Sequence, residues 1–208
     1  MKMYLSSYRL GNNPEKLVRL IGPNKKIAVI PNALDFSTDI PRRNEGVQRE
    51  IDDLNKLGLQ AEEIDLRNYF NKSRELEQKL SEYGALWVRG GNTFVLRRAF
   101  KESGLDEWLK RQKDNKELVY AGYSAGVCIL SPTLKGLEIV DDPVITAEGY
   151  PKETLWDGLG LIDFAFAPHF ESPGHPETEA VGREVERYKK EGVKYRALHD
   201  GEAIVIEG

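Results

Sequence analysis

The sequence predicts a single α/β domain built on a doubly wound, mostly parallel sheet with helices on both faces, in three layers. Short, unbroken apolar runs recur along the chain, which is typical of strands buried on both faces. Between them the apolar residues recur at helical spacing. Strands that alternate with helices of this length favour a parallel sheet. No repeat, low-complexity tract or linker interrupts the pattern, so one domain over residues 1–208 is expected.

Eight segments are expected to form strands. Each is short and largely apolar, and turn or helix signals flank it. They are Met3–Ser7, Lys26–Pro31, Gln60–Leu66, Ala85–Arg89, Leu118–Ser124, Phe164–Pro168, Tyr195–Leu198 and Ala203–Glu207. In a doubly wound sheet the ligand binds beyond the carboxyl ends of the strands, so functional side chains should follow these segments.

Helices are expected where apolar residues are three or four positions apart. Two pieces, around residues 96–100 and 105–109, are expected to be separated at Gly104. The other helical patterns are Val47/Ile51/Leu54/Leu57, Leu76/Leu80/Tyr83 and Val181/Val185/Tyr188.

Composition excludes several classes of function. The chain has 208 residues, 40% hydrophobic and 31% charged, with a net charge of −4. This balance predicts no partner among nucleic acids or anionic membranes. The single cysteine, Cys128, allows no internal disulfide, and no apolar run is long enough to span a membrane. A cytoplasmic location is therefore expected.

The most informative motif is Gly122-Tyr123-Ser124-Ala125-Gly126, between two apolar runs. It predicts a strand, a sharp turn and a helix, with a serine at the turn. Such a turn holds the hydroxyl out of the sheet, and the backbone N–H groups that follow face anything bound there. The motif therefore indicates Ser124 as a nucleophile.

His169 is the best candidate for a base that activates the serine. It closes the predicted strand Phe164–Pro168, whereas His175 lies in a Ser-Pro-Gly-His-Pro loop at the expected pocket rim. A serine hydroxyl needs a base to take its proton, and neutral histidine does this near pH 7. The alternative is a packed histidine bonded to backbone.

A carboxylate should orient the histidine, and three positions compete for this role. Asp200 follows the predicted strand Tyr195–Leu198, and Asp141 and Asp142 precede Pro143. Asp200-Gly201 could instead be the turn of a hairpin, and Asp141-Asp142-Pro143 is itself a turn sequence. Spacing does not separate these alternatives.

The segment Arg89-Gly90-Gly91-Asn92-Thr93 follows another predicted strand. Its glycines let the backbone approach a ligand closely, and Asn92 or Thr93 could cap the next helix. The segment could supply one backbone N–H to an oxyanion hole, with the N–H of Ala125 as the second. An ordinary strand–helix turn is the alternative. The motif lacks the spacing of a phosphate or dinucleotide loop.

Two other groups of residues carry less weight. Cys128 lies one helical turn after Ser124 in an apolar stretch, so a buried structural thiol is expected. His175, Glu177 and Glu179 could suggest a metal, but Pro176 interrupts them and no second histidine is close in sequence. No metal site and no cofactor are expected.

Three segments together resemble the aspartyl dipeptidase (peptidase E) family of serine peptidases. They are residues 90–94 (Gly-Gly-Asn-Thr-Phe), residues 122–126 with Ser131-Pro132-Thr133 after them, and Pro168-His169-Phe170. Their order and spacing match the family over most of the chain. The resemblance implies a class I glutamine amidotransferase-like, flavodoxin-like fold. The serine at the position where amidotransferases carry cysteine argues against glutaminase chemistry.

The resemblance also implies roles for individual residues. It makes Ser124 the nucleophile, His169 the general base, and Gly91 and Ala125 the oxyanion donors. The family's third member is an acid, usually glutamate, in a Leu-x-acid-Gly segment, which Leu198-His199-Asp200-Gly201 fits. An acid soon after the nucleophile is the family's alternative, here Asp141 or Asp142. Substrate contacts are expected from Asn92, Tyr123, His175 and Arg183.

The resemblance implies a small peptide substrate and leaves its side-chain preference open. The family reads the aspartyl side chain with an arginine, and Ala180 stands at that position, with Arg183 one turn further on. We therefore expect a small serine dipeptidase or exopeptidase, a monomer or homodimer. The alternatives are cyanophycinase-like, amidase or esterase activity at the same site, or a non-catalytic ligand-binding member of the fold.

Overall fold

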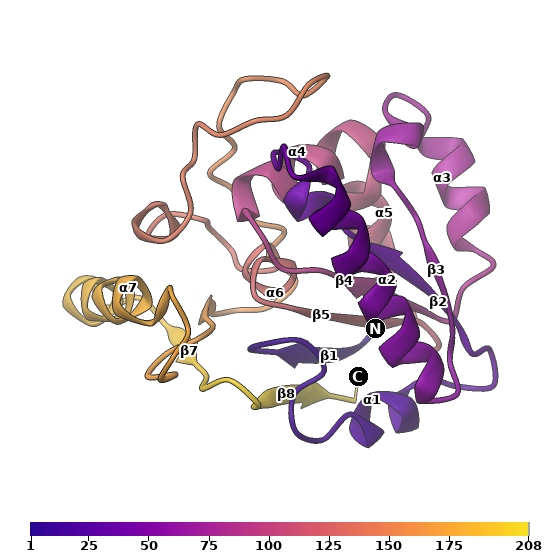
Figure 1. The fold of residues 1–208 in the computed structure, drawn as a ribbon, viewed down its shortest axis with the longest axis horizontal. Helices are drawn as coiled ribbons and strands as arrows, with labels where there is room; N and C mark the ends of the chain where they lie inside the picture. Colours follow the sequence, from indigo (N-terminus) through magenta and orange to yellow (C-terminus); the bar gives the residue numbers. More distant parts are fainter. Residues whose placement is uncertain (208) are drawn as a thin grey trace.

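A six-stranded sheet forms the centre of the molecule in the computed structural model, which describes residues 1–207 (Figure 1). The strand order is β3-β2-β4-β5-β1-β8. The sheet strands are β1 (Lys2–Ser6), β2 (Lys26–Ile30), β3 (Gln60–Glu63), β4 (Ala85–Val88), β5 (Val119–Tyr123) and β8 (Ala203–Ile206). All neighbours pair in parallel except β1 and β8, which are antiparallel. The predicted mostly parallel sheet is confirmed.

The described residues form seven α-helices. They are α1 (Glu15–Leu20), α2 (Ile40–Lys56), α3 (Ser73–Leu80), α4 (Thr93–Ser103), α5 (Leu105–Arg111), α6 (Ala125–Cys128) and α7 (Thr178–Glu191). The break between α4 and α5 falls at Gly104, as predicted. Helix α1 was not predicted, because only Leu17 and Leu20 of its six residues are buried and the pattern is too short to register.

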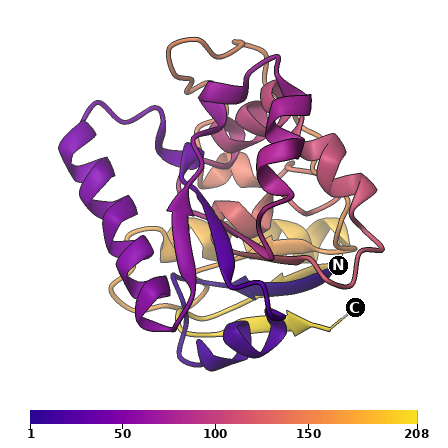
Figure 2. The same cartoon turned by 90° about the vertical axis from the view of Figure 1, so that its right-hand side faces the viewer.

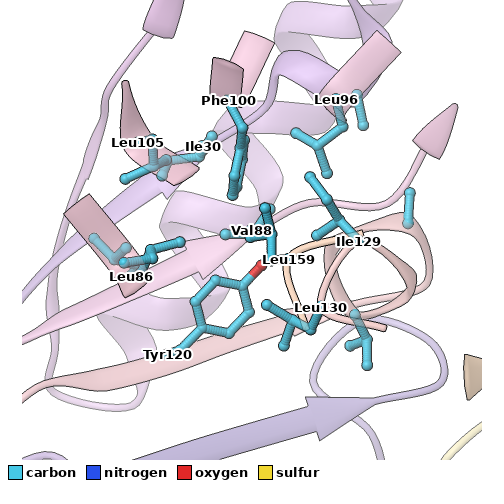
Figure 3. Packing of buried hydrophobic residues seen from close by; sticks show 14 of the residues in the cluster. Ile30, Leu86, Val88, Leu96, Phe100, Leu105, Tyr120, Ile129, Leu130 and Leu159 are labelled. Carbon is cyan, nitrogen blue, oxygen red and sulfur yellow. The ribbon is translucent and has the colours of Figure 1, made fainter. Parts of the chain in front are cut away.

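The helices cover the two faces of the sheet with two separate cores. Side chains of α3, α4, α5 and α6 pack on one face, where Leu86, Val88 and Tyr120 meet Leu96 and Phe100 (Figure 3). Helices α1 and α2 cover the opposite face, as the turned view shows (Figure 2). The strands carry apolar side chains on both sides because both sides are covered, which explains their unbroken apolar runs.

Two predicted strands form a second, smaller sheet. Strands β6 (Ala165–Ala167) and β7 (Tyr195–Ala197) pair in parallel, and α7 packs beside them at one side of the main sheet (Figure 1). Strand β7 therefore pairs with β6, while β8 pairs with β1. The alternative that Asp200-Gly201 closes a hairpin between β7 and β8 is wrong, because these strands belong to different sheets.

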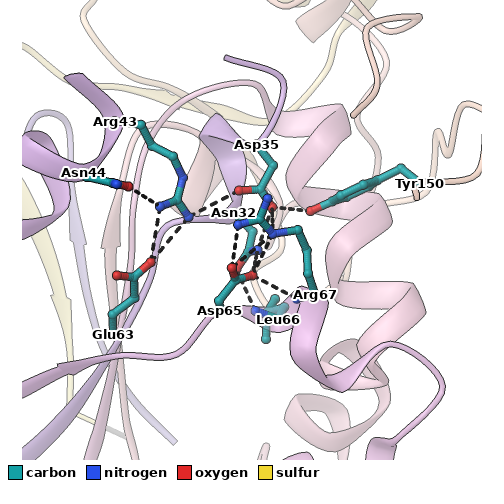
Figure 4. Close-up of polar contacts among 9 residues, drawn as sticks. All are labelled: Asn32, Asp35, Arg43, Asn44, Glu63, Asp65, Leu66, Arg67 and Tyr150. Atoms are coloured by element: carbon teal, nitrogen blue, oxygen red, sulfur yellow. Dashed lines mark hydrogen bonds and ion pairs between the residues drawn. The ribbon is translucent and has the colours of Figure 1, made fainter. Parts of the chain in front are cut away.

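Residues 131–164 form a long connection with little regular structure, and buried polar groups hold it in place. The guanidinium of Arg98 on α4 donates to the carbonyl oxygens of Pro143, Ile145 and Glu153. At the ends of β2 and β3, a polar cluster around Asn32 and Asp35 accepts the hydroxyl of Tyr150 (Figure 4). Among residues 1–207, no helix has the length and apolar character needed to cross a membrane.

Candidate active site

Ser124 occupies the predicted turn between β5 and α6. All five residues of β5 are buried, and the chain reverses at Ser124 with φ 49° and ψ −122°. A side chain at positive φ costs of order 1–3 kcal/mol, which the packed surroundings must supply. Ser124 itself is only partly buried, so its hydroxyl is held at the surface of the sheet edge.

The glycine loop after β4 lies against this turn. A Cβ on Gly90 would come within 2.9 Å of the Cβ of Ser124, and one on Gly91 within 2.5 Å of the carbonyl oxygen of Ala33. Gly91 also has φ +149°. The backbone N–H groups of Gly91 and Ala125 make no backbone hydrogen bond within residues 1–207. Two free donors therefore flank the serine.

His169 and Asp200 meet because β6 and β7 are parallel. Each residue lies just beyond the carboxyl end of its strand, so the two side chains reach the same edge. The Nδ1 of His169 lies 2.6 Å from Oδ1 of Asp200. This contact makes Nδ1 the protonated nitrogen and leaves the Nε2 lone pair free. His169 is 2% exposed, whereas Asp200 is partly buried.

Ser7, at the end of β1, connects this pair to the main sheet. Its buried hydroxyl accepts from the backbone N–H of His169 at 2.8 Å and donates to Oδ1 of Asp200 at 2.9 Å. The preceding residue, Ser6, accepts the backbone N–H of Ser124 at 3.4 Å. Adjacent residues of β1 thus hold the serine turn on one side and the histidine on the other. The Ser124 hydroxyl and Nε2 do not hydrogen-bond, and in unliganded enzymes this contact is often long.

Asp141 and Asp142 have other roles in the described structure. Asp141 accepts the backbone N–H of Thr93 at 2.8 Å, at the first turn of α4. The backbone carbonyl of Asp142 accepts the side-chain amide of Asn92 at 2.9 Å. Neither carboxylate contacts His169 within residues 1–207. Of the three acids that the sequence left open, the structure brings Asp200 to the histidine.

Burial sets the protonation of the groups in the site. Burial lowers the pKa of His169, and its hydrogen bond to Asp200 opposes this shift. His169 is therefore neutral at pH 7 and able to accept a proton. Burial raises the pKa of Asp141 to about 6, and burial with the charges of Asp141 and Asp200 raises the pKa of Glu177 to about 7. Burial also raises the pKa of Cys128 well above its usual value, as expected of a structural thiol.

His175 and Glu177 lie beside the free nitrogen of His169. The rings of His169 and His175 stack at 3.6 Å with 4° between their planes, and Oε2 of Glu177 lies 4.0 Å from Nε2 of His169. Ligand atoms of all three residues lie within 4.8 Å of one another. Because the rings are parallel, however, their lone pairs lie in two separate parallel planes, whereas a tetrahedral metal needs lone pairs that converge on one point.

The other residues predicted to contact substrate differ in whether their side chains already make contacts within the protein. The amide of Asn92 already serves the fold, because its oxygen caps α4 and its nitrogen donates to the carbonyl of Asp142. The hydroxyl of Tyr123 donates to Glu50 at 2.6 Å in the buried interior. Arg183 lies on the exposed side of α7 and makes no ion pair within residues 1–207. Their role in substrate binding stays a prediction.

Sequence reasoning missed Ser7, Tyr8 and the place of Glu177. Ser7 ends the predicted strand Met3–Ser7 and Tyr8 follows it, which is a usable signal, but neither belongs to a recognisable motif. The ring of Tyr8 makes edge contacts with His169, His175 and Tyr123, at centroid distances of 5.8, 5.6 and 6.0 Å. Only the folded chain reveals that these residues surround the histidine.

Comparisons with known proteins identify the family of the chain. The model of peptidase family S51 matches residues 8–208. An uncharacterised peptidase of Listeria monocytogenes is 31% identical over 155 residues, which cover 74% of this chain and 71% of that relative. Peptidase E of Streptomyces coelicolor is 29% identical over 134 residues, 62% of this chain and 51% of that protein.

A solved structure extends the likeness to the fold. The crystal structure of a Listeria monocytogenes protein described as a candidate peptidase E has a TM-score of 0.75 at 27% identity. It covers 100% of this chain, and 94% of that chain is matched. With the family model matching nearly the full length, the chain belongs to peptidase family S51 and is a serine peptidase.

Proposed function

We propose that this serine peptidase hydrolyses short peptides as a dipeptidase or exopeptidase through a triad of Ser124, His169 and Asp200. The observation that carries the proposal is the 2.6 Å contact between Nδ1 of His169 and Asp200, which the adjacent residues Ser6 and Ser7 connect to the Ser124 turn after β5. An acid bonded to Nδ1 holds the imidazole in the tautomer whose Nε2 can accept a proton.

The reaction follows the chemistry of serine hydrolases. Oγ of Ser124 attacks the substrate carbonyl carbon while Nε2 of His169 takes its proton. The N–H groups of Gly91 and Ala125 stabilise the negative oxygen of the tetrahedral intermediate. As that intermediate collapses, the C–N bond breaks and the leaving amine takes the proton from Nε2. Water, deprotonated by the same nitrogen, then attacks the acyl-enzyme and releases Ser124.

Glu177 favours substrates with a free amino terminus. Its carboxylate lies 4.0 Å from Nε2 of His169, and no Lys or Arg pairs with it within residues 1–207. In a peptide the α-nitrogen of the acyl residue is about 2.5 Å from the carbonyl carbon. An α-ammonium near Glu177 would thus stand beside a carbonyl within reach of the serine. This charge pairing supports cleavage after the first residue of a short peptide.

The test uses Ser124→Ala against a panel of dipeptides, tripeptides, N-acetylated peptides, esters and amides. We expect the wild-type enzyme to cleave short peptides with a free amino group fastest. Ser124→Ala should lose at least about 10³-fold in kcat/KM, because no other group replaces the nucleophile. Ser103→Ala, which removes a buried hydroxyl bonded within α4, is the matched control.

Two results would overturn the proposal. Activity of Ser124→Ala close to that of the control would exclude the serine as nucleophile. A wild-type enzyme that turned over esters or amides but no peptide of the panel would move the function to the esterase or amidase alternative.

A further inference from the structure

Glu50 on α2 is a buried carboxylate that the reaction above does not use. It is 8% exposed and lies on the helix face that packs against the sheet. Three groups of the sheet surround it. The Tyr123 hydroxyl donates to Oε1 at 2.6 Å, the indole N–H of Trp87 donates to Oε2 at 2.9 Å, and Nε of Arg89 lies 3.0 Å from Oε1.

These three groups come from the ends of two neighbouring strands. Trp87 lies on β4 and Arg89 directly after it, two residues apart and so on one face of the sheet. Tyr123 is the last residue of β5, the strand that pairs with β4. The carboxylate of Glu50 therefore links the ends of β4 and β5 on the sheet face that α2 covers.

Helix α2 leaves space for the guanidinium of Arg89. Gly46 lies one turn before Glu50, and a Cβ at this position would come within 2.5 Å of Nη2 of Arg89. A larger side chain there would displace the guanidinium. The space left by Gly46 and the Glu50 carboxylate four residues later thus together form the position that the Arg89 guanidinium occupies.

Two of the three groups around Glu50 come directly before the loops that carry the oxyanion donors. Arg89 comes directly before Gly90-Gly91, and Tyr123 comes directly before Ser124-Ala125. The loops also touch, because a Cβ on Gly90 would come within 2.8 Å of the Tyr123 ring and 2.9 Å of the Ser124 Cβ. A shift at either strand end would therefore change the distance between the two N–H groups.

We infer that Glu50 is a positioning residue that sets the spacing of the oxyanion donors Gly91 and Ala125 by holding Arg89 and Tyr123 together. This inference rests on the proposed function, because it needs an oxyanion at that place. Two donors stabilise a developing charge only when both reach the same oxygen, so a small displacement affects the transition state more than the bound substrate.

The test compares Glu50→Gln with Asp106→Asn. Asp106 is a matched control because it is also buried, at 5% exposure, and pairs with a buried arginine, Arg97, at 2.9 Å on α4 and α5. Rates are expressed per active site titrated with a fluorophosphonate, so that unfolded protein does not count. The affinity for a peptide boronate, which forms a tetrahedral adduct on the serine, reports on the oxyanion hole.

We expect Glu50→Gln to lower kcat by about 10-fold to 100-fold with KM within about twofold, and to weaken boronate binding in proportion. Asp106→Asn should keep kcat near the wild-type value. A Glu50→Gln enzyme with wild-type kcat and boronate affinity, or one no more impaired than Asp106→Asn, would overturn the inference.

A second variant covers failure of Glu50→Gln to fold. Tyr123→Phe removes only the hydroxyl that Glu50 accepts, and we expect kcat to fall by about threefold or more at constant KM. Unchanged kcat in that variant would overturn the inference. Ser124→Ala separates the two proposals: if it is inactive while Glu50→Gln equals wild type, the nucleophile stands and only the role of Glu50 fails.

Discussion

The two halves of the site are built by different means. The nucleophile half, Ser124 with Gly90 and Gly91, is positioned by backbone at the ends of adjacent strands of the main sheet. The base half, His169 with Asp200 and Glu177, lies on loops beyond the small β6–β7 sheet. There the positions depend on hydroxyl groups: Ser7 holds His169 and Asp200, and Thr178 donates to the carbonyl of His169 at 2.8 Å.

The halves also differ in how their carboxylates are compensated. Glu50, under the nucleophile half, forms an ion pair with Arg89 and accepts two hydrogen bonds, from Trp87 and Tyr123. Glu177 and Glu184, at the base half, have no Lys or Arg partner within residues 1–207. Burial raises the pKa of all three carboxylates, but at Glu50 the charge of Arg89 and the hydrogen bonds from Tyr123 and Trp87 oppose the shift. The difference teaches that a positive charge and two hydrogen bonds favour the ionised form of the carboxylate under the nucleophile half, whereas the base half should respond to pH and to the loss of single hydroxyls.

The largest expected effect is the loss of the proposed base. His169→Ala should lower kcat/KM by about 10³-fold to 10⁴-fold, because the serine then keeps its proton. His175→Ala removes the stacked ring but no group of the proposed triad, so its loss should be much smaller. Steady-state kinetics on one dipeptide compares the two variants. Equal losses in the two variants would contradict the assignment of His169, rather than His175, as the base.

The base half should also make stability depend on pH. Glu184 is fully buried, and burial raises its pKa to about 8, above the ordinary value near 4.3 in the unfolded chain. The folded state then holds a proton that the unfolded state releases. The free energy of unfolding therefore falls as pH rises between those values, by up to about 1.4 kcal/mol for each pH unit.

Glu184→Gln tests this dependence because glutamine keeps the shape without the proton. Urea unfolding at pH 5, 6, 7 and 8 should give a flatter curve for the variant than for the wild-type protein. The variant's advantage should be greatest at pH 8. Parallel curves would mean that Glu184 does not carry the effect.

Ser7→Ala tests whether hydroxyl groups position the base half. The variant loses the buried acceptor for the His169 N–H and the partly buried donor to Asp200. We expect kcat/KM to fall by about 10-fold to 100-fold, since about 1 Å of misplacement can cost that much. Ser103→Ala is the control for losing a buried serine hydroxyl elsewhere. Similar kinetics in both variants would contradict the positioning role.

The smallest expected effect concerns Glu177. Glu177→Gln should raise KM for dipeptides with a free amino group by about tenfold, the size of one modest charge interaction. It should leave KM for the matching N-acetylated peptides unchanged. An equal change in KM for the free-amino and the N-acetylated peptides would mean that Glu177 has a structural role and does not bind the α-ammonium.

The sequence predicted the nucleophile half more completely than the base half. All eight strands were predicted, and the motif around Ser124 defines its own local geometry through neighbouring residues. The choice between Asp200 and Asp141 stayed open, because it depends on β6 and β7 pairing in a separate sheet. Ser7 was not identified, since its contacts join residues 162 and 193 positions apart. Long-range contacts of single hydroxyls leave no pattern in a lone sequence.

The central claim is that Ser124 is the nucleophile and His169 its base. The most direct measurement is labelling with a fluorophosphonate, followed by mass spectrometry of the peptide that carries the adduct. We predict a single adduct on Ser124 in the wild-type enzyme, strongly slowed labelling in His169→Ala, and none in Ser124→Ala. An adduct on another residue, or undiminished labelling of Ser124→Ala, would contradict the account.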